Sequence, residues 1–146
     1  MPANTAPVFA ITPINTWLSG AAANAATPGV TANTSKDGSS GTVYGPIYTG
    51  GANGSRLDFI RLRALGTNVA TVCRVWLNNG GATTTASNNT LLTEATLAAT
   101  TLSEVAALAD NTININQSIP AGYKIYLTFG TATAAGFHAT AVGGDY

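Results

Sequence analysis

The side chains that could carry out acid–base or nucleophilic chemistry are few and scattered. The 146 residues include one histidine, His138, one cysteine, Cys73, and two glutamates, Glu94 and Glu104. A Ser-His-Asp arrangement could be built only around His138, and a glycosidase pair only from the two glutamates. No HExxH, CxxC or EF-hand spacing indicates a metal site, and no glycine-rich loop carries the P-loop lysine. We therefore expect a protein that is not an enzyme and that needs no cofactor.

The arginines are the one concentration of charge in the chain. Four of its six cations stand close together: Arg56, Arg61, Arg63 and Arg74. They could form a solvated strand face, a nucleic-acid platform interleaved with aromatic rings, or a protein interface. The net charge is zero, which argues against a protein that neutralises several phosphates. Because Arg and Trp are favoured at interface hot spots, we favour a protein interface formed by Arg61, Arg63, Arg74 and Trp76.

The overall composition supports the same interpretation. Charged residues make up only 8% of the chain and hydrophobic residues 45%, whereas an ordinary soluble domain has roughly 25% charged residues. A weakly charged surface repels other copies poorly, which suits a subunit of an assembly. Cys73 is alone, so no internal disulfide is possible, and its place in a strand pattern predicts a buried thiol. No signal peptide and no membrane span are predicted.

Frequent Gly, Asn, Pro and Ser residues divide the chain into about eight short strands separated by turns. The strand patterns occupy 42–49, 57–64, 69–77, 90–97, 122–130 and 136–144. LGTN at 65–68 is predicted to be a hairpin turn that joins the two central strands. A change of phase within the first of these two predicts a β-bulge near Phe59–Ile60, which leaves Arg61 and Arg63 side by side on the outer face.

The other segments are less regular. Residues 98–109 match both helical and strand spacing, and we allow a short helical turn at 103–109. Residues 1–41 are predicted to be an N-terminal arm and flexible connection, with Phe9, Ile11 and Trp17 as anchors on a neighbouring subunit. Residues 42–146 then form the folded domain, an all-β antiparallel β-sandwich or jelly roll.

Two segments resemble a known family. IPAGYKIYLTFGTATAAGFHATAVGGDY at 119–146 resembles the end of small jelly-roll proteins of tailed bacteriophages, where a PAG turn and an alternating strand precede a final strand ending near GGDY. LDFIRLRALGTNVATVCRVWLNNG at 57–80 is similar to their central hairpin. These proteins are capsid decoration, or cement, proteins, including those of cyanophages.

The resemblance implies a homotrimer that sits on the exterior of the virion and clamps neighbouring copies of the major capsid protein. It implies assembly in the host cytoplasm, with neither nucleic acid nor membrane as a partner, and it brings no catalytic motif. Two alternatives are a tail, neck or fibre component and a carbohydrate- or cell-surface-binding sandwich. In the second alternative, Trp17, Trp76 and either Tyr44 or Tyr48 would form the sugar platform.

Overall fold

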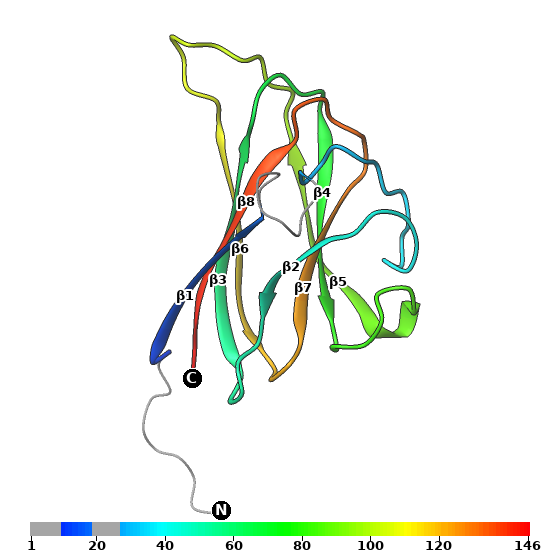
Figure 1. The fold of residues 1–146 in the computed structure, drawn as a ribbon, viewed down its shortest axis with the longest axis vertical. Helices are drawn as coiled ribbons and strands as arrows, with labels where there is room; N and C mark the ends of the chain where they lie inside the picture. Colours follow the sequence, from blue (N-terminus) through cyan, green and yellow to red (C-terminus); the bar gives the residue numbers. More distant parts are fainter. Residues whose placement is uncertain (1–9, 19–26) are drawn as a thin grey trace, which may run out of the picture.

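The computed structural model describes residues 10–18 and 27–146, which form two antiparallel four-stranded sheets packed face to face (Figure 1). The strands are β1 (Thr12–Leu18), β2 (Tyr44–Thr49), β3 (Ser55–Ala64), β4 (Thr71–Asn78), β5 (Asn89–Leu97), β6 (Asp110–Ile119), β7 (Lys124–Phe129) and β8 (Phe137–Asp145). A single 3-10 turn, η1 (Ala86–Asn88), precedes β5. The predicted all-β sandwich is confirmed for this part of the chain.

The chain crosses from one sheet to the other at almost every connection between strands. The first sheet has the order β1-β8-β3-β6 and the second sheet the order β2-β7-β4-β5. Only β4 and β5 are both consecutive in sequence and paired with each other. The predicted hairpin at 65–68 is therefore wrong, because β3 lies in the first sheet and β4 in the second. Alternation identifies a strand and its buried face, but it does not identify the strand's partner.

The core lies between the sheets and contains the apolar residues that the alternation predicts. Ile125, Leu127 and Phe129 of β7 are fully buried, as are Phe137, Ala139 and Ala141 of β8. The Phe129 ring stacks on Phe137 at a centroid distance of 5.5 Å and meets the edge of Tyr44 at 5.6 Å. Cys73 is completely buried, as predicted, and this burial raises the pKa of its thiol.

The predicted bulge in β3 exists, but it lies slightly earlier than expected. The register of β3 against both β6 and β8 shifts between Leu57 and Phe59. Leu57 therefore faces the core while Phe59 is partly exposed on the outer face. The guanidinium carbon of Arg61 lies 5.8 Å from the centroid of the Phe59 ring, within the range of a cation–π contact.

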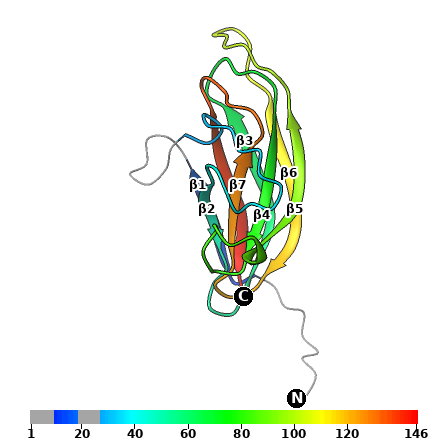
Figure 2. The ribbon, with the colours of Figure 1, turned by 90° about the vertical axis from the view of Figure 1, so that its right-hand side faces the viewer.

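Two segments differ from their predicted structure. Residues 12–18, assigned to the N-terminal arm, form β1 and pair with β8 along the edge of the first sheet. Pro13 does not break this strand, because an edge strand can spare one backbone donor. Residues 98–109 contain no helical turn: they form a projecting loop at one end of the sandwich in both views (Figures 1 and 2). The strand β6, which follows this loop, was not predicted.

Residues 27–43, hereafter the covering segment, run over the outer side of the second sheet (Figure 1). Residues 27–41 were predicted to belong to a flexible connection, yet the covering segment bonds repeatedly to the sandwich. The amide of Asn33 donates to the carbonyl of Phe129 at 2.7 Å, and the amide and hydroxyl of Thr133 both donate to the carbonyl of Gly29. This part of the predicted flexible connection is therefore attached to the fold, and the boundary at residue 41 does not separate it from the sandwich.

Candidate interaction surface

The outer face of the first sheet carries the side chains that the sequence singled out on β3. We call it the arginine face; its residues are Trp17, Phe59, Arg61, Arg63, His138 and Thr140. Trp17 and Arg61 are both in register with Thr140 of β8, and residues paired across strands point to the same side of a sheet. Trp17 and Arg61 therefore belong to one row, with their backbones about 10 Å apart across two strand spacings.

A second row contains the other arginine of this face. Arg63 is in register with His138 on one side and with Asp110 on the other. Its Nε lies 2.9 Å from Oδ1 of Asp110, and about half of each side chain is exposed. An ion pair this exposed contributes about 0–1 kcal/mol, so Arg63 is available to other partners at little cost.

The arginine face is open to solvent. Trp17 is 65% exposed, and Arg61, Arg63 and His138 are also exposed. Ile11, just before β1, is 81% exposed, whereas Phe9 lies outside the described residues. The structure therefore brings Trp17 together with Arg61 and Arg63, a grouping that the sequence could not supply because it placed Trp17 in an arm.

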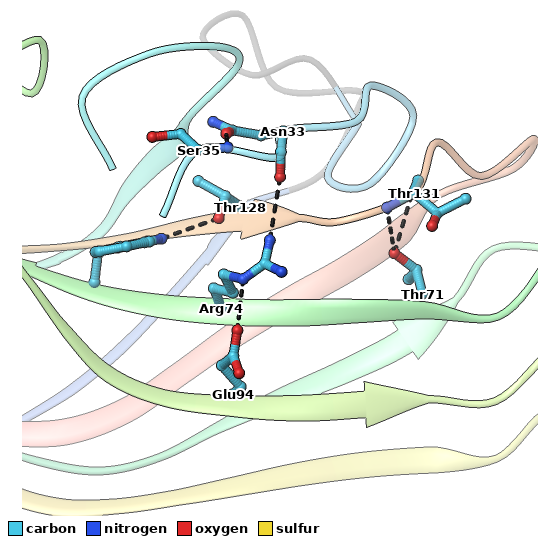
Figure 3. A network of polar contacts seen from close by, with 8 residues as sticks. Asn33, Ser35, Thr71, Arg74, Glu94, Thr128 and Thr131 are labelled. Atoms are coloured by element: carbon cyan, nitrogen blue, oxygen red, sulfur yellow. Dashed lines mark hydrogen bonds and ion pairs between the residues drawn. The ribbon is translucent and has the colours of Figure 1, made fainter. Parts of the chain in front are cut away.

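Arg74 and Trp76 do not join this surface. They lie on the outer side of the second sheet, where the covering segment buries them, and only 7% of Arg74 and 3% of Trp76 is exposed. The Nε of Trp76 donates to Oγ1 of Thr128 at 2.9 Å (Figure 3). The predicted interface group therefore separates into two pairs, because β3 and β4 belong to different sheets. Arg61 and Arg63 lie on the arginine face, and Arg74 and Trp76 lie under the covering segment.

The polar groups around Arg74 hold the covering segment in place. Its Nε donates to Oε1 of Glu94 at 2.5 Å, and its Nη1 donates to the carbonyl of Asn33 at 3.2 Å (Figure 3). The side chain of Asn33 in turn donates to the carbonyls of Ser40 and Thr42. A turn in this segment is fixed by Asp37, whose pKa is lowered to about 2 by hydrogen bonds from the side chain and backbone of Ser39 and from the side chain of Ser35.

Replacing Glu94 with glutamine is expected to destabilise the fold by about 1–3 kcal/mol, because it removes the counter-charge of a buried guanidinium. Urea unfolding of the variant measures this loss. Glu104→Gln is the matched control, since Glu104 is exposed on the projecting loop and its variant should stay within about 0.5 kcal/mol of the parent protein. Equal stability of the two variants would mean that the buried Arg74 does not need the counter-charge of Glu94.

The predicted sugar platform is not assembled. Of its four candidates, Tyr44, Tyr48 and Trp76 are buried, and only Trp17 is exposed. Within the described part of the chain, no group of three His, Cys, Asp or Glu residues could hold a metal ion. No helix there is long and apolar enough to span a membrane.

No known protein family, curated protein or solved structure matches this chain.

Proposed function

We propose that this protein is a structural subunit of a virus particle, a capsid decoration protein that binds the outer shell as a homotrimer and stabilises it. The observation that carries the proposal is the difference between its two outer sheet faces. The chain covers part of the second sheet, over Arg74 and Trp76, with its own residues 27–43, whereas the arginine face carries an exposed tryptophan and two exposed arginines. These residue types concentrate binding energy in protein interfaces.

The strand order supports a jelly-roll assignment. In the orders β1-β8-β3-β6 and β2-β7-β4-β5, the first and last strands are neighbours and all connections but one cross between the sheets. Two interleaved Greek keys give this pattern, and jelly rolls of this kind are common in viral capsid proteins. Fold alone does not assign a function, so the proposal also draws on the resemblance of the closing segment to cement proteins.

In this proposal the arginine face binds the major capsid protein, and neither nucleic acid, membrane nor cofactor takes part. The role is structural rather than catalytic. The zero net charge leaves the molecule as a whole without a general attraction for polyanions. A partner surface with carboxylates opposite Arg61 and Arg63 and an apolar recess for Trp17 would complement the face.

Imaging of virus particles made with and without the gene tests the proposal. Electron cryomicroscopy should show additional density on the outside of the shell, at three-fold positions, only when the protein is present. Density confined to the tail, neck or fibres would assign the protein to those structures instead. Particles without any such density would overturn a virion role.

The oligomeric state of the purified protein is a separate expectation. Light scattering should give about three times the chain mass of 14.7 kDa, because the resemblance to cement proteins implies a homotrimer and a weakly charged subunit suits a closed symmetric assembly. The measurement should be repeated over a range of protein concentrations. A monomer at every concentration would contradict a preformed trimer.

A further inference from the structure

A pocket of about 330 Å³ opens on the outer side of the second sheet, away from the arginine face. Its lining includes Arg74, Gly130 and the threonines Thr71, Thr96 and Thr131. These residues come from β4, from β5 and from the turn after β7, so three adjacent strands form the site. Arg74 is the only charged residue among the residues that line it.

Arg74 has hydrogen-bonding capacity that the residues described by the structure do not use. A guanidinium has five N–H donors; Nε bonds to Glu94 and one N–H of Nη1 to Asn33. The Nη2 atom has no hydrogen-bond acceptor in the part of the chain that the structure describes. In Figure 3 it points along the sheet toward the side where Thr71 and Thr131 lie. A buried arginine therefore presents free donors to an open pocket.

Gly130 keeps these donors accessible. A Cβ atom at this position would lie 3.6 Å from Nη1 and 3.7 Å from Nη2 of Arg74, so any larger side chain would cover the guanidinium. The backbone does not require glycine here, because Gly130 lies outside the positive-φ region. The missing side chain thus leaves room for a ligand beside the guanidinium.

The local charge favours a monoanion over a dianion. Glu94 already neutralises part of the Arg74 charge from the other side, so a phosphate would meet more repulsion than a carboxylate. A planar carboxylate also matches the paired donors of a guanidinium. Thr96 and Thr131 line the pocket, and a threonine hydroxyl there can donate to a second oxygen.

We propose that this pocket binds a carboxylate through the free donors of Arg74. The carboxylate comes either from an acidic side chain of a partner protein or from a free small molecule. The site is independent of the arginine face, since it lies on the opposite sheet.

The test follows the Nε–H NMR signal of Arg74 in the full chain during titration with sodium acetate and with a short peptide that has blocked ends and one aspartate between glycines. With both probes, the chemical-shift change of this signal should reach a plateau as the probe concentration rises. The shifts of the Arg61 and Arg63 signals should not reach a plateau. The asparagine form of the peptide should bind about tenfold more weakly or worse, because it lacks the charge. If the aspartate peptide binds more tightly than acetate, the carboxylate comes from a protein side chain. If the two probes bind equally, it comes from a small molecule.

Two variants keep the test independent of folding. Gly130→Val should weaken acetate binding by about tenfold or more, since it fills the space beside the guanidinium. Gly130→Ala adds a methyl group at ordinary van der Waals distance from Arg74, so it should keep the native spectrum. Its acetate binding should be weaker than that of the parent protein and stronger than that of Gly130→Val. Unsaturated acetate shifts, unchanged binding by a folded Gly130→Ala variant, or tighter binding of inorganic phosphate than of acetate would each overturn the proposal.

Discussion

Replacing Asn68 with alanine is expected to lower the free energy of unfolding by about 3–5 kcal/mol, because two backbone amides lose their acceptor and the Gly136 carbonyl keeps only its bond from the Leu65 amide. The side-chain oxygen of Asn68 accepts from the amides of Ala135 and Gly136 at 2.8 and 3.0 Å, and its Nδ2 donates to the carbonyl of Gly136 at 2.9 Å. Asn68 is only 3% exposed, so water cannot replace these bonds without opening the loops. Urea unfolding followed by tryptophan fluorescence measures the change.

Two further variants make this prediction specific. Asn68→Asp keeps an acceptor for both amides but turns a carboxylate oxygen toward the Gly136 carbonyl in a buried site, so it should also lower the stability. Asn53→Ala is the control for the substitution itself, because Asn53 is exposed and makes one long bond of 3.4 Å. A stability of Asn68→Ala within about 0.5 kcal/mol of this control would contradict the structural role of Asn68.

Asn68 also shows why the sequence predicted strands better than their pairing. LGTN has the composition of a hairpin turn, and the strands on either side alternate as predicted. The segment instead arches from the first sheet to the second, where Asn68 bridges to Thr100 and binds the turn before β8. These contacts join residues far apart in sequence, and local periodicity contains no information about them.

The covering segment was misjudged for a different physical reason. It lacks apolar periodicity, so it was predicted to be flexible, and its attachment depends on polar groups instead. Asn33 is 2% exposed and bonds through both its side chain and its backbone. Gly29 has a φ of 94°, a backbone conformation that other residues rarely adopt. A Cβ atom at this position would also lie only 2.9 Å from the ring of the buried Phe137.

The same limits apply to the candidate interaction surface. The phase change in β3 correctly placed Arg61 and Arg63 side by side, because that inference needs only local alternation. The sequence could not show that Trp17 lies in the same row, since this depends on the pairing of β1 with β8. Nor could it show that Arg74 is buried, because this depends on residues 27–43 folding back over β4.

If the arginine face binds the capsid as proposed, replacing Arg61 and Arg63 together with alanine should weaken binding to virus particles by about 2–5 kcal/mol, since both would lose charged partners at a buried interface. This corresponds to a rise of about 30-fold or more in the dissociation constant. Stability should change by no more than about 1 kcal/mol, because the only ion pair lost within the described chain is the exposed one between Arg63 and Asp110. Co-sedimentation with particles that lack the protein measures binding, and urea unfolding measures stability.

The matched control is the double variant Lys36→Ala and Lys124→Ala. It removes the same charge from the covering segment and from β7 of the second sheet, so it separates the arginine face from a general electrostatic effect. The control should bind particles as the parent protein does. Equal weakening of both double variants would indicate long-range attraction alone, and unchanged binding by the arginine variant would show that Arg61 and Arg63 are simply solvated. A trimer that persists while particle binding is lost would place the capsid contact, rather than the subunit contact, on the arginine face.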